Sequence, residues 1–124
     1  MPASMTMSRN QRLAKEAAER GANALDEWYG SEAWADEIVL NGAAGLRMSD
    51  MTRCVLGQLF GGFHRIPGNL MKHMGRTTPT GAGPALIYHG FDILNGENDY
   101  FPELTDAWYS EIEGRQGWGL VTPW

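Results

Sequence analysis

The sequence predicts a small all-α domain of four to five helices joined by long glycine-rich loops. Apolar residues recur at spacings of three and four in most segments, which is the period of an α-helix. Sixteen of the 124 residues are glycine, well above the usual share of about 7%, and this favours long connections. The chain length and the 43% share of hydrophobic residues suit one core within one domain.

The first predicted helix covers residues 9–29 and follows a flexible start at residues 1–7. Ser8 is placed to cap its first turn, and Gln11 stands where a capping box needs a side chain that reaches back. Small apolar side chains recur at helical spacing along the segment. Gly30 follows it, as expected for a residue that ends a helix in the left-handed conformation.

For residues 31–48, the sequence predicts a short second helix followed by an irregular connection. Ser31 begins the helix, and its buried side consists of Trp34, Ala35 and Ile38. The turn signal Asn41-Gly42 interrupts residues 39–48, so this stretch is either a loop with inward-pointing anchors or one short hairpin.

A third helix is predicted over residues 50–60, with Ser49 or Asp50 as its cap. Its apolar side comprises Met51, Val55, Leu56, Leu59 and Phe60. Gly57 within it predicts a point where another segment packs closely, because a glycine inside a helix is otherwise destabilising. Gly61-Gly62 ends the helix.

Pro67 begins a fourth predicted helix, and Gly75 ends it. Its apolar side comprises Leu70, Met71 and Met74. Residues 76–84 contain two prolines and two glycines and are predicted to form a loop. Residues 85–94 fit either a short strand or a helical turn.

The last predicted helix starts at a capping Asp99 and runs to about Arg115. Its apolar stripe comprises Phe101, Leu104, Trp108 and Ile112. A tryptophan-rich tail, residues 116–124, follows the helix, so the helical domain itself is predicted to cover residues 8–115.

The charges are distributed unevenly, and the net charge is −5. Residues 51–90 contain four arginines and lysines and no acidic residue, whereas residues 91–124 contain seven acidic residues against Arg115. The pattern indicates either a basic face that meets an anionic partner or a basic segment that packs beside the acidic one.

The composition also excludes some classes of protein. The net negative charge argues against a nucleic-acid binder. No apolar run is long enough to span a membrane. Residues 1–12 lack the apolar centre of a signal peptide, which predicts a cytoplasmic protein.

Patterns for catalysis and metal binding are weak. The possible metal ligands are Cys54, His64, His73 and His89, but their spacing matches no local zinc motif, so no metal or cofactor is predicted. Cys54 has apolar neighbours on a predicted helix, which is typical of a small buried side chain rather than of a nucleophile. No residue is predicted to be catalytic.

Partner binding is the better-supported role for several aromatic and basic residues, because tryptophan, tyrosine and arginine dominate the energetic centres of protein interfaces. Phe63, His64 and Arg65 follow the two glycines that end the third helix. Trp118 and Trp124 lie in the tail, where packing on the chain's own core is the alternative. These five residues are the predicted partner-binding set.

The segment Cys54-Val-Leu-Gly-Gln-Leu-Phe-Gly61 resembles a group of small uncharacterised proteins from actinobacterial phages, whose motif is Cys-Val-Leu-Gly-Gln-Leu-(Phe/Tyr)-Gly. Segments similar to Trp34–Ile38, Gly90-Phe91 and Tyr100–Trp108 flank the motif in the same order. Many members of that group have Cys-x-x-Cys before the motif, whereas this chain has Met51 at the first position. A shared metal or dithiol role is therefore in doubt for this chain.

The resemblance implies a phage genome as the source, and small accessory phage proteins often act by binding a host protein. From the residues themselves we interpret Cys54, Gly57, Gln58 and Gly61 as structural positions. Three functions stay open. The favoured one is a non-enzymatic binder of a host or phage protein, for example an inhibitor of host physiology or defence. The others are a virion structural or assembly component, and a small metal protein or enzyme that uses Cys54 and the histidines.

Overall fold

The computed structural model describes residues 7–93 and 100–121, and every regular element in these ranges is helical, which confirms the predicted all-α class. In chain order the elements, with η for a 3₁₀ helix, are α2 (Arg9–Tyr29), η1 (Ala33–Glu37), α3 (Val55–Phe60), η2 (Phe63–Arg65), α4 (Gly68–Arg76), α5 (Ala85–Tyr88) and α6 (Phe101–Val121).

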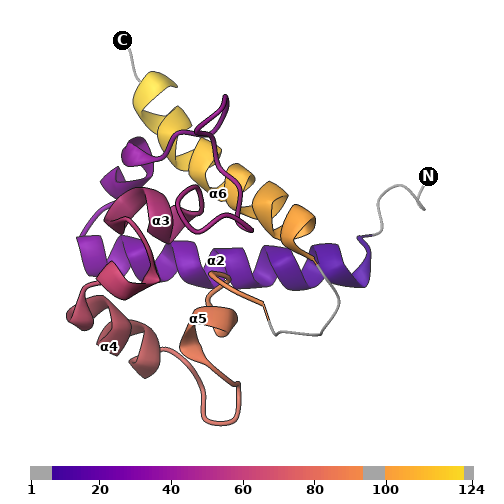
Figure 1. Ribbon diagram of the computed structural model, residues 1–124, viewed down its shortest axis with the longest axis vertical. Helices are drawn as coiled ribbons and strands as arrows, with labels where there is room; N and C mark the ends of the chain where they lie inside the picture. The colour runs from indigo at the N-terminus through magenta and orange to yellow at the C-terminus, as the bar shows by residue number, and fades with distance from the viewer. Residues whose placement is uncertain (1–6, 94–99, 122–124) are drawn as a thin grey trace.

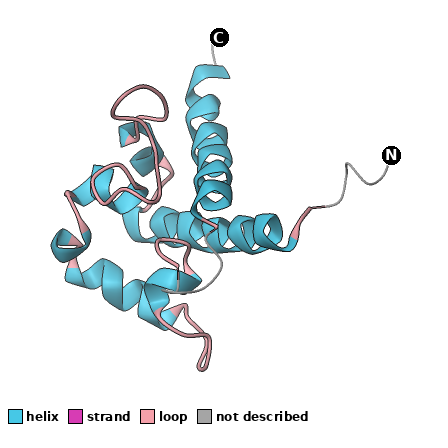
Figure 2. Ribbon diagram, turned by 45° about the vertical axis from the view of Figure 1, so that its right-hand side comes forward, coloured by secondary structure: helices cyan, strands magenta, loops and turns pink. Residues whose placement is uncertain are grey.

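The two long helices, α2 and α6, cross each other and form the frame of the domain (Figure 1). The elements η1 and α3 lie on one side of α2, and α4 and α5 lie on the other. Figure 2 shows α6 rising steeply from α2.

Both ends of α2 form as the sequence predicts. The hydroxyl of Ser8 accepts a hydrogen bond from the backbone N–H of Gln11 at 3.1 Å. The side chain of Gln11 accepts one from the N–H of Ser8 at 2.8 Å, which completes the capping box. At the other end, Gly30 has a φ of 87°, in the left-handed region that favours glycine.

Small residues on one face of α2 allow α6 and the residues after α5 to approach closely. A Cβ atom on Gly21 would lie 2.1 Å from the carbonyl oxygen of His89 and 2.6 Å from Cζ2 of Trp108, so only glycine fits there. Gly90 has a φ of 76° and packs on the backbone of Ala17, where a Cβ would come within 2.8 Å. The indole N–H of Trp108 donates to the carbonyl of Gly90 at 2.7 Å. Three segments of the chain therefore meet at one point.

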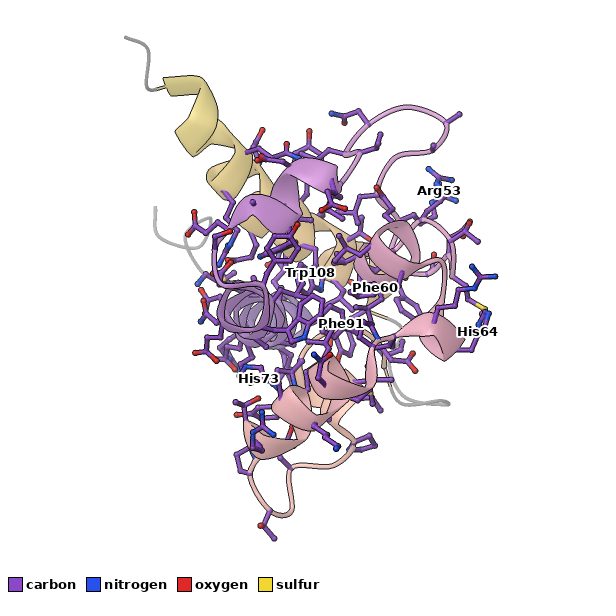
Figure 3. All side chains as sticks on the ribbon, turned by 90° about the vertical axis from the view of Figure 1, so that its left-hand side faces the viewer. Arg53, Phe60, His64, His73, Phe91 and Trp108 are labelled. Atoms are coloured by element: carbon purple, nitrogen blue, oxygen red, sulfur yellow. The ribbon has the colours of Figure 1, made fainter. Side chains whose placement is uncertain are left out.

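Trp108 is also the centre of a buried aromatic cluster. Its ring stacks on Phe91 with 5.1 Å between centroids and meets Trp34 edge-on at 6.3 Å. Figure 3 shows Phe91 and Trp108 side by side in the interior. Aromatic pairs of this kind contribute about 0.5–1.5 kcal/mol each beyond the burial of their surface.

A polar clamp joins α2, η1 and α6. Arg115 donates from Nε and Nη2 to the two carboxylate oxygens of Asp26 at 3.0 and 2.7 Å, and from Nη1 to Glu111 at 2.9 Å. The indole of Trp34 donates to the same Asp26 carboxylate at 2.8 Å. The hydrogen bonds that Arg115 donates, first to Asp26 and then to Glu111, raise the pKa of Arg115 above its ordinary value. Gln116 adds hydrogen bonds to the carbonyls of η1 and of the residue that follows it.

The third helix is shorter than predicted, because it begins at Val55 and its cap is Cys54 rather than Ser49 or Asp50. The Asp50 carboxylate instead accepts hydrogen bonds from the N–H and hydroxyl of Thr52, each at 2.9 Å, within a separate turn. Met51 lies in that turn and is 62% exposed, so the prediction that it belongs to the apolar side is wrong.

Residues 39–48 form a loop, with Leu46 and Met48 as buried anchors, and not a hairpin. The reason is that the N–H and carbonyl of Val39 bond to the side chain of Gln58 and not to a neighbouring strand. Residues 85–88, left open between strand and helix, form the single helical turn α5.

Two other helices end at different residues from those predicted. α4 continues past Gly75 to Arg76, and Met71, predicted on its apolar side, is 37% exposed and not buried with Leu70 and Met74. α6 continues to Val121 rather than ending near Arg115, since Gln116 holds this part of the helix against η1. The predicted cap Asp99 lies outside the described residues.

Gly21→Ala is expected to lower the free energy of unfolding by about 1–3 kcal/mol, because the added methyl overlaps the His89 carbonyl and the Trp108 ring. Chemical denaturation measures the change. Gly114→Ala in α6 is the matched control, since no atom lies within 4 Å of its added Cβ. It should stabilise the fold by about 0.5–1 kcal/mol. Equal effects of the two substitutions would contradict the close approach at Gly21.

Asp26→Asn is expected to destabilise the fold by about 1–3 kcal/mol, because Arg115 loses its charged partner in a largely buried position. Glu19→Gln is the control, since it removes a carboxylate from the exposed Lys15–Glu19 pair on the same helix. That variant should unfold at the same denaturant concentration as the unmodified protein. An unchanged midpoint for Asp26→Asn would show that the clamp does not stabilise the fold.

Candidate interaction surface

Four exposed basic residues follow one another along η2 and α4: His64, Arg65, Lys72 and Arg76, together termed the basic surface. Lys72 and Arg76 are four residues apart and so share one face of α4. The opposite face of the helix buries Leu70 and Met74. Figure 3 shows His64 at the outer edge of the molecule, directed away from the core.

The arginines and the lysine of the basic surface have no carboxylate partner in the described part of the chain. The ion pairs found there join Lys15 to Glu19, His73 to Glu27, and Arg115 to both Asp26 and Glu111. The acidic C-terminal segment thus uses Glu111 to pair with Arg115 of its own helix. Within residues 7–93 and 100–121, no ion pair joins the basic segment to the acidic one, and whether the two segments compensate by packing beside each other stays a prediction.

The Cys54–Gly61 segment builds α3 and turns the chain into η2. The sulfur of Cys54 accepts a hydrogen bond from the N–H of Gly57 at 3.3 Å. Gly57 has the close contact expected of it, since an added Cβ would lie 2.1 Å from the carbonyl oxygen of Met51. Gly61 ends the helix with a φ of 95°. These contacts set the direction in which the chain enters η2.

Gln58 connects α3 to two other segments through its side-chain amide. Its Oε1 accepts from the N–H of Val39 at 2.7 Å, and its Nε2 donates to the carbonyls of Val39 and Arg53, each at 3.0 Å. The motif indicated that Gln58 is structural but gave no partner for it. The contact with Val39 spans 19 residues, and no local spacing pattern indicates it.

The predicted partner-binding residues do not all lie together. His64 and Arg65 are exposed on η2, which also contains the backbone of Phe63. Trp118 is in the last part of α6, which points to a different end of the molecule from η2 (Figures 1 and 3). The side chains of Phe63 and Trp118, and all of Trp124, lie outside the described part of the chain.

An aromatic group that sequence reasoning missed lies where α2 meets α3 and α4. Trp28 contacts Phe60 edge-on at 5.8 Å between centroids and Tyr29 at 6.0 Å. The indole N–H of Trp28 donates to the side chain of Asn69 at 3.1 Å. Trp28 and Phe60 are half-buried, and Tyr29 is 45% exposed. The sequence contains little signal for this group: Phe60 ends the apolar side predicted for residues 50–60, and Trp28 lies near the end of the helix predicted over residues 9–29.

A small open cavity of about 180 Å³ lies between α2, α5 and the end of α4. Its lining includes Arg20, Asn23, Glu27, Thr77, Tyr88 and His89. His89 is only 1% exposed. Its Nδ1 donates to the carbonyl of Ala85 at 2.8 Å, because a carbonyl can only accept, and its Nε2 lies 2.8 Å from the hydroxyl of Thr77. Both ring nitrogens of His89 therefore have partners within the chain.

Charged groups from two helices surround His89. Burial is the main cause that lowers its pKa, and the positive charges of Arg20 on α2 and of His73 on α4 act in the same direction. Glu27, which lies 2.9 Å from His73 and opposes this effect, is the acidic group near the ring. His89 is therefore a neutral side chain at pH 7.

Cys54 is a buried free cysteine. Burial raises the pKa of Cys54, which favours the protonated thiol over the thiolate. No three His, Cys, Asp or Glu side chains among the described residues are close enough to hold a metal ion. The candidates Cys54, His64, His73 and His89 lie on separate elements and do not converge.

Comparison of the chain with protein-family models, with curated proteins and with solved structures finds no match. Among the described residues, no helix combines the length and hydropathy that crossing a bilayer needs.

The buried, neutral His89 predicts that the fold loses stability in mild acid. Its pKa is lowered in the folded state from the ordinary value of 6.5, so the unfolded chain binds a proton first as the pH falls. The free energy of unfolding should therefore decrease between about pH 7.5 and about pH 5.5. His89→Gln should show a smaller decrease, whereas His64→Gln, at an exposed site, should keep the full decrease. Equal slopes for both variants would contradict this assignment.

Proposed function

We propose that this chain is a non-enzymatic accessory protein of a phage, which acts in the host cytoplasm by binding a host or phage protein, for example to inhibit host physiology or defence. The observation that carries the proposal is the basic surface on η2 and α4. Surface charges without an internal partner attract and orient a partner of opposite charge. The partner is therefore a protein with an acidic face.

The aromatic group of Trp28, Tyr29 and Phe60 lies beside α4 and supports the proposal that a partner binds on this side of the molecule. Trp28 and Phe60 are half-buried and Tyr29 is exposed, so a partner could bury more of each ring. Interfaces gain most of their energy from a few aromatic and arginine side chains surrounded by polar residues. Trp28 and Tyr29 supply aromatic side chains of this kind, and the hydrogen bond from Trp28 to Asn69 places them beside α4, which carries Lys72 and Arg76.

The phage source rests on the resemblance of the Cys54–Gly61 segment to small phage proteins. The proposal that the chain is not an enzyme is supported by the state of Cys54, whose burial and raised pKa oppose a nucleophilic role. A virion component remains the principal alternative, and self-association distinguishes it from a host-protein binder.

The test is affinity capture from nuclease-treated actinobacterial lysate, with mass spectrometry of the retained proteins. The double variant Lys72→Glu and Arg76→Glu should retain at least about tenfold less partner, because it reverses both charges on the exposed face of α4. The matched control is Arg9→Glu and Arg12→Glu, which makes the same change in charge on the exposed N-terminal part of α2. The control should retain the partner fully.

Capture of one stoichiometric acidic protein that the α4 variant loses would support the proposal. Equal loss with the α2 variant would show that only net charge matters. Retention of further copies of the chain would favour a virion component. Binding that disappears on nuclease treatment would show that the ligand is a nucleic acid.

A further inference from the structure

Arg20 has a fixed guanidinium group with a free edge. Its Nε donates to the carbonyl of Tyr88 at 2.8 Å, and the guanidinium carbon lies 4.0 Å from the centroid of the Tyr88 ring. These two contacts orient the group without neutralising it. Neither terminal nitrogen of Arg20 has a hydrogen-bond partner, and no carboxylate pairs with it, in the ranges that the structure describes.

We propose that the cavity beside Arg20 binds the carboxylate group of a compact organic acid, with the free edge of the guanidinium as the main donor. The planar fork of arginine matches the two oxygens of a carboxylate. Asn23 lies three residues after Arg20 on the same face of α2, also lines the cavity, and has no partner for its amide among the described residues. It can donate a further hydrogen bond to the bound group.

The surroundings favour a single negative charge over a phosphate. Glu27 is part of the lining and carries the same sign as the ligand, although its carboxylate is engaged with His73. The lining residue Thr77 follows the C-terminal end of α4, where the helix dipole is negative. Arg20 is the only arginine or lysine among the described residues of the lining, so one monovalent group balances it.

The size of the cavity limits the ligand. A volume of about 180 Å³ is below the range of about 300–1,000 Å³ that is usual for sites of drug-sized ligands. The half-buried Tyr88 side chain provides uncharged surface on which a short carbon chain can lie. This site is on different residues from the basic surface and does not depend on the proposed function.

The experiment is an NMR titration of the full chain with propionate, with propionamide as a neutral compound of nearly the same shape. Ionic strength is held constant with chloride. Propionate should shift the Arg20 Nε–H and the His89 ring signals in a saturable manner, and propionamide should not. Propionate should also raise the pKa of His89, because a negative charge beside Arg20 offsets the repulsion between the two residues.

Asn23→Asp is the decisive variant, because it places a carboxylate one helical turn from Arg20 without touching the Tyr88 contacts. It should weaken propionate binding by at least about tenfold. Arg20→Lys keeps the charge but removes the fork, and should weaken binding by a similar factor. Arg12→Lys, at an exposed position on the same helix, is the matched control and should bind normally.

Three results would overturn the proposal: no saturable shift with propionate, equal shifts with propionamide, or unchanged affinity in Asn23→Asp. Spectra of each variant without ligand establish that it is folded, so a loss of binding reports on the site.

Discussion

The architecture depends on the absence of a side chain at Gly21. A Cβ at this position would collide with both the His89 carbonyl and the Trp108 ring, so α6 and the residues after α5 can approach α2 this closely only because residue 21 is glycine. The same contact brings Trp108 within hydrogen-bond distance of Gly90 and places its ring between Phe91 and Trp34. The Trp108 ring and the His89 backbone thus both pack against Gly21, where α2 has no side chain.

The polar contacts that hold the shorter helices in place are made by residues of α2 and α6. The crossing of these two helices brings Arg115 to Asp26, which also receives the indole of Trp34 and so attaches η1. On the other side of α2, the contacts between His73 and Glu27 and between Arg20 and Tyr88 hold α4 and α5. These contacts use the inner faces of the short helices, and the outer face of α4 is left to solvent.

The arginines of this fold have different roles because their surroundings differ. Arg115 is paired with the carboxylates of Asp26 and Glu111, and these ion pairs join α6 to α2. Arg20 is held by a carbonyl and an aromatic ring, which orient it, and no carboxylate in the described ranges pairs with it. The basic surface is a third case, in which the charges are exposed and have no partner within the described ranges. An unbalanced, oriented charge beside a cavity suits a small ligand, whereas exposed charges beside aromatic rings suit a protein.

The sequence by itself determined the all-α class, the ends of α2 and the glycine contact within α3, because these follow from residues a few positions apart. The Ser8–Gln11 capping box is complete within three residues, so its pattern could be read directly. The prediction that Asp50 caps the third helix was wrong, because its carboxylate accepts a hydrogen bond from Thr52 within a separate turn. Only the tertiary structure decided what Gly21, Gln58 and Arg115 contact, which basic residues stay unpaired, and that Arg20 faces a cavity. The Arg115–Asp26 pair joins residues 89 positions apart, and no local periodicity encodes a contact at that separation.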